Sequence, residues 1–332
     1  MKKLSIFLSV VFLALCFSSC KKNEDNKLTA TEIRMDTVVT LTIPVGSEDV
    51  LDGAFDVCRK YEKLFSRTIE SSDVSRINTA EGKVTKVSLE TAELISLALE
   101  ISAESNGAFD ITVLPLVELW NINEATTPPK AEDISSTLKH VGYNNLSLNK
   151  ESVSLAQNTK IDLGGIAKGY IADKVRDYLL SERITEAIIN LGGNVTVIGD
   201  NDGKNYSVGI QKPFSLHGES AAILKLENKT AVTSGIYERY FKVDNTIYHH
   251  IIDPKIGYPV QNNVASVTVI ADSSALADSL STACLVLGIE QGMKLAKSKG
   301  AEIVLIDTNG KITVSNGLKI DHNGTIPKII LK

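Results

Sequence analysis

Residues 160–170 bring an acid, two glycines and a lysine into one short stretch. Asp162 comes just before Gly164 and Gly165, and Lys168 follows in the next turn of chain. The pattern predicts a strand that turns through the glycines into a helix. Free amides at the start of such a helix favour an anionic ligand, Lys168 adds positive charge, and Asp162 can accept hydrogen bonds. A purely structural turn has the same pattern, which matches neither the P-loop nor the dinucleotide fingerprint.

Asp278, Ser281 and Thr282 form a second polar group, in a stretch that predicts a helix of about three turns between Ser273 and Gly288. Ser273 is a good N-cap, and Gly288 is a good helix stop. The three polar residues stand at i, i+3 and i+4, so they share one face. One carboxylate and two hydroxyls make part of the oxygen shell that Mg²⁺ takes. An aspartate that only complements the helix dipole is the alternative that the spacing leaves open.

Two adjacent histidines, His249 and His250, come before a turn at residues 254–257 that contains proline and glycine. Histidine is the side chain best suited to take a hydroxyl proton near neutral pH. Because neighbouring residues on a strand point to opposite faces, only one of the two can serve one catalytic site. A metal-free surface pair in a hairpin is the alternative at this stage.

A fourth segment, residues 105–112, is a polar break after a predicted helix. Asn106 and Gly107 predict a helix stop or turn there. Phe109 can stack on an aromatic ring, and Asp110 can hydrogen-bond one, although the segment alone supports no chemistry.

The elements that must position these residues are short and mixed in type. Apolar residues recur at helical spacing in residues 50–64 and 89–103, and residues 32–43 alternate as in a half-buried strand. Residues 161–199 read as strand, glycine turn, helix, strand, glycine turn and strand, and residues 207–270 hold short alternating runs. Without a regular βαβ alternation, the pattern favours an α+β fold with largely antiparallel sheets and packed helices.

The N-terminal residues 1–19 have a basic start and a short apolar run, which is typical of a secretory signal. Small residues directly before Cys20 and a polar stretch after it predict a lipoprotein signal, with Cys20 as the lipidated residue and residues 20–30 as a tether. The mature domain then spans residues 31–332, with two possible lobes meeting near residues 127–149. The protein would be lipid-anchored on the periplasmic side of the inner membrane. An ordinary signal peptide with an incidental cysteine, or an uncleaved membrane helix, are the alternatives.

The composition argues against a nucleic-acid partner and against a fold held by disulfides or by a cysteine-bound metal. The net charge is −5 and no basic block follows the signal, so the sequence gives no electrostatic footprint for nucleic acid. Beyond Cys16 and Cys20 only Cys58 and Cys284 remain, which are too few for a disulfide framework or a thiolate metal site. Buried free thiols are expected, with a single disulfide between the two as the alternative.

These motifs together resemble those of the ApbE family of FAD:protein FMN transferases, over nearly all of the mature sequence. The matching segments follow the family's order along the chain: residues 35–37, 107–112, 162–169, 190–193, 233–235, 250–254 and 277–282. The resemblance implies an ApbE-like fold with the flavin in a central cleft, FAD as the substrate and Mg²⁺ as the cofactor.

The resemblance also implies roles for single residues. The positions where the family contacts FAD are Met35, Thr68, Ala108, Phe109, Asp110, Asp162, Lys168 and Ile252. The positions that hold Mg²⁺ are Gly165, through its carbonyl, and Asp278, Ser281 and Thr282. His250 falls on a histidine that the family needs for transfer. Three positions depart from the family pattern: Asp36 stands in place of a glycine, Thr68 in place of an aromatic residue, and Ser281 in place of a second aspartate.

The activity that the resemblance implies is transfer of the FMN part of FAD to a protein hydroxyl. A threonine or serine of the acceptor would attack, a phosphoester-linked flavin would form, and AMP would leave. Expected acceptors are proteins with FMN-binding domains, such as subunits of membrane redox pumps. Two alternatives remain for the same site: a Mg²⁺-dependent FAD pyrophosphatase that gives FMN and AMP, and a lipoprotein that only binds FAD.

Overall fold

A computed structural model of the 332-residue chain describes residues 21–22 and 26–332. The predicted signal peptide and the predicted lipidation of Cys20 lie outside the described residues. Within the described residues, no helix is both long enough and apolar enough to cross a membrane.

The centre of the molecule is a nine-stranded sheet with the order β1-β2-β3-β7-β8-β11-β14-β15-β16, in which all neighbouring strands are antiparallel. Its strands are β1 (Lys21–Lys22), β2 (Lys27–Arg34), β3 (Thr37–Pro44), β7 (Ala187–Leu191), β8 (Asn194–Ile198), β11 (Thr230–Gly235), β14 (Val264–Ala271), β15 (Glu302–Asp307) and β16 (Ile312–Val314).

The remaining described strands form three smaller sheets. The first has the order β17 (Leu318–Asp321), β18 (Lys328–Leu331), β10 (Ser220–Leu226) and β9 (Tyr206–Gln211). The second joins β4 (Thr85–Lys86), β6 (Ser152–Leu155) and β5 (Leu146–Asn149), and the third is the hairpin of β12 (Tyr240–Val243) and β13 (Thr246–His249). Among the described strands, only β10 and β18 pair in parallel. The predicted α+β class with largely antiparallel sheets is therefore confirmed.

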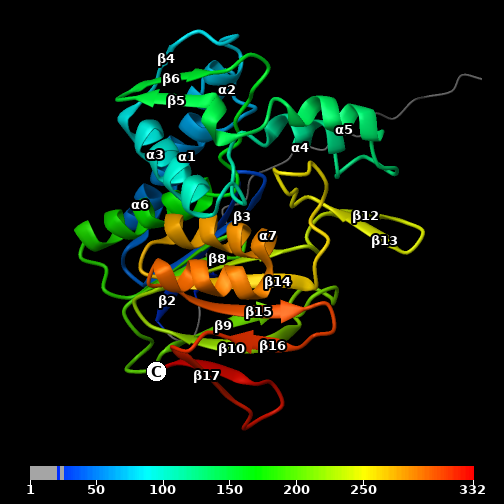
Figure 1. Ribbon diagram of the computed structural model, residues 1–332. Coiled ribbons are helices and arrows are strands. Elements are labelled where there is room, and N and C mark those ends of the chain that lie inside the picture. The colour runs from blue at the N-terminus through cyan, green and yellow to red at the C-terminus, as the bar shows by residue number, and fades with distance from the viewer. Residues whose placement is uncertain (1–20, 23–25) are drawn as a thin grey trace, which may run out of the picture.

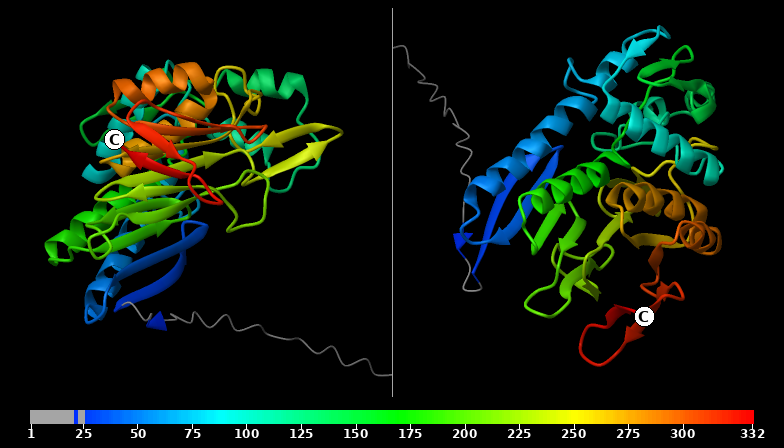
Figure 2. Two further views of the ribbon diagram at one scale, coloured as in Figure 1. Left: turned by 90° about the horizontal axis from the view of Figure 1, so that it is seen from below. Right: turned by 90° about the vertical axis from the view of Figure 1, so that its left-hand side faces the viewer.

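Helices cover one face of the large sheet, and the four-stranded sheet covers the other (Figure 1; Figure 2). The helices on the first face are α1 (Glu48–Phe65), α6 (Ala167–Ser181) and α7 (Ser274–Ser298). Because β14 lies between these two layers, all eight of its residues are buried. The other helices are α2 (Asp73–Asn78), α3 (Leu89–Glu104), α4 (Leu114–Trp120), α5 (Ala131–Leu138) and the short 3-10 turn η1 (Tyr143–Asn145).

Helices were predicted better than strands. Helices α1 and α3 match the periodic stretches 50–64 and 89–103 closely. The single strand predicted over residues 32–43 is wrong, because β2 and β3 form a hairpin whose turn residues, Met35 and Asp36, both have positive φ. The strand predicted before the glycine turn is also wrong: residues 161–163 belong to no strand, and only the neighbouring Lys160 makes one isolated bridge.

The helix predicted between Ser273 and Gly288 begins as expected, because the Ser273 side chain accepts a hydrogen bond from the amide of Leu276. Gly288 has non-helical backbone angles (φ 76°, ψ −176°), so it interrupts the helix at the predicted place. The chain then resumes a helical course to Ser298. The glycine is therefore a kink between two helical segments.

Both cysteines of the described domain are buried free thiols, so the alternative of a disulfide between them is wrong. Burial, with Glu32 as the next cause, raises the pKa of Cys58 to about 12. Burial likewise raises the pKa of Cys284 to about 12. Neither thiol is therefore a nucleophile near neutral pH.

Candidate active site

The glycine turn at Gly164 is held in shape by the acid that precedes it. One carboxylate oxygen of Asp162 accepts a hydrogen bond from the amide of Gly164 at 2.8 Å. The amide of Asp162 donates to the carbonyl of Ile111 at 2.8 Å, which ties the turn to residues 105–112. Lys168, in the first turn of α6, donates from Nζ to the carbonyl of Gly164 at 3.0 Å. The acid, the glycines and the lysine are thus one local unit.

Helix α7 crosses α6 closely at Gly169. A Cβ atom at Gly169 would lie 2.2 Å from the carbonyl oxygen of Ser274, so only glycine allows this approach. Across the contact, Oδ2 of Asp278 accepts a hydrogen bond from the amide of Gly169 at 2.9 Å. The same oxygen lies 3.9 Å from Nζ of Lys168. The two motifs that were predicted separately therefore meet at Asp278 and Lys168.

The start of α7 is fixed by an acid on α6, Asp173. Its two carboxylate oxygens accept hydrogen bonds from the hydroxyl of Ser273 (2.9 Å), the amide of Ser274 (2.9 Å) and the amide of Ala275 (3.0 Å). These amides have no partner inside the helix, so a carboxylate here acts as an N-cap and stabilises the positive end of the helix dipole. Asp173 thus fixes the position of α7, and with it the position of Asp278.

A cluster of hydroxyls lies beside Asp278. Oγ of Ser234, in β11, lies 2.7 Å from Oγ of Ser281 and 3.2 Å from Oγ1 of Thr282. The Ser281 hydroxyl is fully buried and donates to the carbonyl of Asp278 at 2.8 Å. A Cβ atom at Gly165 would lie 3.7 Å from Oγ1 of Thr282, so the glycine turn reaches the same place.

Asp278 carries its charge in a place that disfavours charge. It is 4% exposed, and burial raises its pKa, while the cation of Lys168 and the amide of Gly169 act in the opposite direction. A buried carboxylate is stable when it is paired or binds a cation. A cation next to Asp278, such as Lys168, therefore favours the charged form of this carboxyl group.

His249 and His250 occupy different environments, as the strand alternation predicted. His249 is 1% exposed, and its Nε2 lies 2.8 Å from the carbonyl of Val260. His250 is half-buried, with Nδ1 3.3 Å from the carbonyl of Arg239. Burial, followed by the cation of Arg239, lowers the pKa of His250 to about 3, and Lys168 contributes in the same direction. The alternative of a surface pair is wrong, and His250 is a neutral imidazole near neutral pH.

Residues 105–112 end helix α3 and pack against the glycine turn of the site. Asn106 and Gly107, both with positive φ, end α3 as predicted. The Asp110 carboxylate accepts hydrogen bonds from the amide and hydroxyl of Thr112 (2.8 and 2.6 Å) and from the amide of Tyr143 (2.6 Å), and burial raises its pKa. The ring of Phe109 lies 3.1 Å from where a Cβ atom of Gly165 would stand. Phe109 thus touches the glycine turn.

The remaining residues that were predicted to contact FAD differ in their exposure to solvent. Ala108 and Ile252 are buried, and Thr68 is exposed. Met35 lies in the β2–β3 turn, where its amide donates to Glu62 at 2.7 Å. Next to Thr68, Nε of Arg67 lies 3.6 Å from Oδ2 of Asp162. No motif predicted this cation, although an arginine is the residue type expected beside an anionic ligand.

Comparison with known proteins identifies the family of this site. The model of the ApbE family matches residues 35–305. A FAD:protein FMN transferase from Klebsiella pneumoniae is 35% identical over 299 residues, which cover 88% of this chain and 93% of that protein. A FAD:protein FMN transferase from Haemophilus influenzae is 30% identical over 336 residues, which cover 95% and 97%. The chain belongs to the ApbE family.

Solved structures of ApbE proteins share the fold. The crystal structure of the ApbE protein from Thermotoga maritima matches with a TM-score of 0.81 at 32% identity, covering 87% of this chain and 97% of that one. The flavin transferase ApbE from Vibrio cholerae matches with a TM-score of 0.79 at 27% identity, covering 90% and 98%. The predicted resemblance and the ApbE-like fold are therefore confirmed.

Residues of the motifs 107–112, 162–169, 233–235 and 277–282 thus meet in one place, with additions that the motifs did not predict. The contacts given above join five of the predicted residues: Asp162, Gly165, Lys168, Asp278 and Thr282. The positive charge of Lys168 also helps to lower the pKa of His250. Three residues were missed as members of the site: Ser234, Arg67 and Arg239. Ser234 lies in the motif of residues 233–235, so that motif was the one available signal.

Proposed function

We propose that this chain is a Mg²⁺-dependent FAD:protein FMN transferase, which attaches FMN to a threonine or serine hydroxyl and releases AMP. The observation that carries the proposal is the junction of Asp278, Lys168 and the Asp162 turn, with the neutral His250 nearby. Its relatives carry the name FAD:protein FMN transferase at 30–35% identity over most of the chain. The junction could neutralise the negative charge of a diphosphate, and the neutral imidazole could accept a proton.

The oxygens near Asp278 fit Mg²⁺. Magnesium takes oxygen ligands and commonly uses one or two carboxylates completed by substrate phosphates and water. Asp278 would give the carboxylate, Thr282 and Ser281 hydroxyls, and Gly165, whose backbone approaches Thr282, its carbonyl. Among the described residues, no three His, Cys, Asp or Glu side chains gather as a cation site, so a bound Mg²⁺ would take one carboxylate here and complete its shell with hydroxyls, phosphates and water. When bound, the cation would neutralise charge on the diphosphate.

The chemical step breaks the phosphoanhydride bond of FAD and forms a phosphoester bond to the acceptor. The acceptor's hydroxyl oxygen attacks the phosphorus on the FMN side of FAD, and the bond between that phosphorus and the bridging oxygen breaks. The bridging oxygen leaves with AMP, while the flavin remains bound to the protein through a phosphoester. Catalysis of this kind depends mainly on positioning and charge neutralisation. Lys168 and the amides at the start of α6 are the groups of this chain that would stabilise the charge on the phosphates.

His250 is proposed as the base that takes the hydroxyl proton. In the free protein, burial, Arg239 and Lys168 keep its pKa low, so the imidazole is neutral and has a free electron pair. The diphosphate of FAD would oppose the charge of Lys168 and so raise the pKa of His250 when the substrate binds. A base that strengthens on substrate binding suits a transfer that must wait for FAD.

Membrane attachment would place the enzyme beside its acceptors. The proposed lipid anchor at Cys20 holds the domain at the periplasmic face of the inner membrane, where FMN-binding subunits of redox pumps are expected. A single anchored chain also restricts the enzyme to the membrane surface and raises its local concentration there.

Separation of the nucleotides after reaction tests this proposal. The chain is incubated with FAD and Mg²⁺, with and without a purified FMN-binding domain of a redox pump, and the nucleotides are separated by chromatography. Transfer predicts AMP only when the acceptor is present, without free FMN. Free FMN together with AMP in the absence of acceptor would instead identify a pyrophosphatase, and unchanged FAD under all conditions would identify a binding protein.

A further inference from the structure

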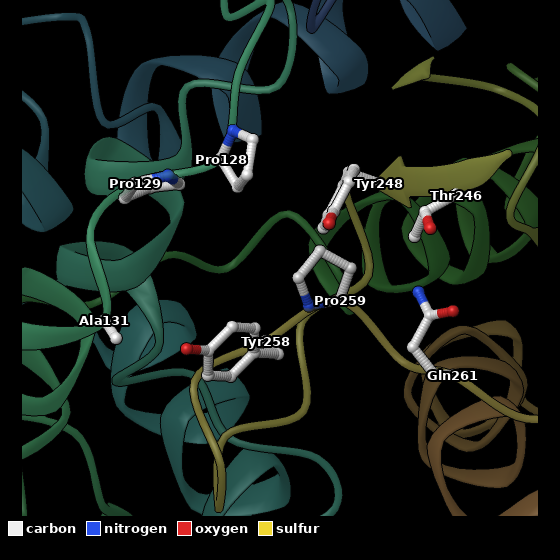
Figure 3. A pocket seen from close by; sticks show the side chains of 8 residues that line it. All are labelled: Pro128, Pro129, Ala131, Thr246, Tyr248, Tyr258, Pro259 and Gln261. Atoms are coloured by element: carbon white, nitrogen blue, oxygen red, sulfur yellow. The ribbon is translucent and has the colours of Figure 1, made fainter. Parts of the chain in front are cut away.

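A cavity of about 390 Å³ lies next to the segment that carries His250. Pro128, Pro129 and Ala131 form one side of it, and Tyr248, Tyr258 and Pro259 form the other (Figure 3). Thr246 and Gln261 are its polar members. No charged side chain is among the described residues that line it. The lining is therefore suited to a neutral, partly apolar ligand rather than to a diphosphate.

The aromatic wall of the cavity packs on a buried tryptophan. Trp120 is fully buried beneath it, and its ring stacks on Tyr248 at 5.6 Å and meets the edge of Tyr258 at 5.8 Å. The indole N–H of Trp120 donates to the carbonyl of Gly257 at 2.7 Å. Phe241 stacks on the Tyr248 ring at 5.3 Å. A cavity with fixed walls binds its ligand with little loss of side-chain entropy.

The edge of β13 borders the same cavity. Among the described strands, β13 pairs only with β12, through a hairpin with the two-residue loop 244–245. In such a hairpin the closing pair is hydrogen-bonded, so the next residue, Ile247, turns its N–H and C=O outward. The side-chain amide of Gln261 donates to the carbonyl of Ile247 at 3.1 Å. The outward N–H of Ile247 is therefore the backbone group that an added peptide strand would find, because the Ile247 carbonyl already has a side-chain donor in Gln261.

The cavity lies close in sequence to the proposed base. Tyr248 comes two residues before His250, which at about 3.3 Å per residue puts their Cα atoms within about 7 Å of each other. Two hydrogen bonds hold residues 249–251 against Val260. Nε2 of His249 lies 2.8 Å from the Val260 carbonyl, and the Val260 amide donates to the Ile251 carbonyl at 3.0 Å. A few residues of extended chain therefore span from His250 into the cavity.

We propose that this cavity and the outer edge of β13 bind the acceptor protein, as an extended segment next to the hydroxyl that is modified. The proposal rests on the proposed function. The segment adds to β13 as a strand and accepts a backbone hydrogen bond from the Ile247 amide, and one of its apolar or proline side chains enters between the Tyr and Pro rings. Strand addition fixes the register of the segment, and so presents one hydroxyl to His250.

Two substitutions at exposed lining positions test this proposal without disturbing the core. Thr246→Glu adds a charge at the mouth of the cavity, and Ala131→Trp fills its space. The matched controls are Thr325→Glu, in the exposed loop between β17 and β18, and Ala103→Trp, on the exposed side of α3. FMN transfer is measured at saturating FAD and Mg²⁺ while the concentration of a purified FMN-binding redox-pump domain is varied. The Kd of FAD is measured for every variant.

The proposal predicts that both lining variants raise the KM for the acceptor by about tenfold, the loss of one modest contact, with an unchanged Kd for FAD. The controls behave as the wild type. An unchanged acceptor KM in both lining variants would overturn the docking proposal while the transfer function stands. A weaker FAD affinity in those variants would assign the cavity to FAD and overturn it as well. Absence of transfer by the wild type would overturn the proposed function and the docking with it.

Hydrogen exchange gives a second, independent reading of the strand edge. The amide of Ile247 should exchange more slowly when the acceptor domain is added to the wild-type chain, because it becomes hydrogen-bonded to the added strand. The same protection should be lost with Thr246→Glu and kept with Thr325→Glu. Protection that is absent with the wild type, although transfer occurs, would contradict strand addition.

Discussion

The Asp278 carboxylate accepts a hydrogen bond from the Gly169 amide at 2.9 Å, although the two residues are 109 positions apart in sequence. This contact joins the start of α6 to the polar face of α7, and it holds Asp278 beside Lys168. The close crossing at Gly169 permits it, and the Asp173 cap fixes it. The account of this site depends on that junction.

Asp278→Asn should abolish transfer without unfolding the protein. The amide can still accept a hydrogen bond from Gly169, but it removes the negative charge, so we expect a loss of at least about 100-fold in rate, the order seen when one key electrostatic group is removed. Because burial raises the pKa of Asp278, its charged form is disfavoured in the fold, and the melting temperature should not fall. Asp272→Asn, at an exposed acid just before the same helix, is the control; equal losses in both variants would sink the assignment.

Ser234→Ala should weaken the response to Mg²⁺. Its hydroxyl lies 2.7 Å from that of Ser281 and 3.2 Å from that of Thr282, so its loss removes the contact that holds these two hydroxyls beside β11. Removing such a supporting group typically lowers metal affinity about 10–100-fold. A Mg²⁺ titration of the transfer rate measures this change. Ser279→Ala, at a buried hydroxyl that bonds only to its own helix, should leave the titration unchanged.

Asp173→Ala should destabilise the fold through α7. Three donors at the start of the helix lose their acceptor, and the loss of an N-cap costs about 0.5–2 kcal/mol. The free energy of unfolding in urea measures this cost. Ser298→Ala, which removes a hydroxyl near the other end of α7, is the comparison. If the two variants lose equal stability, Asp173 does not fix the start of the helix.

His250 should make stability depend on pH. Its pKa falls from 6.5 in the unfolded chain to about 3 in the fold, so the folded state binds fewer protons between these values. The free energy of unfolding therefore falls as the pH is lowered through this window. His249 acts in the same direction, because burial lowers its pKa too. His250→Asn removes one of the two contributions, and its stability should decline less steeply with acid; parallel curves for the two proteins would contradict the low pKa.

The sequence predicted the local parts of the site well. Helices α1 and α3, the Ser273 cap and the stop at Asn106 and Gly107 follow from periodicity and from backbone preferences, which act within a few residues. The β2–β3 hairpin was missed because its turn uses Met35 and Asp36 at positive φ, and turn rules expect glycine or asparagine there.

Local sequence patterns could not predict contacts between segments that are far apart in the chain. The 233–235 motif contains Ser234 but does not indicate that it reaches α7, and nothing near Arg67 in the sequence indicates that it reaches Asp162, because both contacts join segments that are distant in sequence. The opposite placement of His249 and His250 followed from strand alternation, whereas the low pKa of His250 depends first on its burial and then on the charges of Arg239 and Lys168 from other segments. The family resemblance brought together motifs that physical patterns alone left ambiguous.

The intact mass of an acceptor domain after incubation with the wild-type chain, FAD and Mg²⁺ tests the central claim most directly. The account predicts an added mass of one FMN, absent from an acceptor whose modified threonine or serine is replaced by alanine, and absent when His250→Asn replaces the wild-type chain. An unmodified acceptor would contradict the account, as would full modification by the His250 variant.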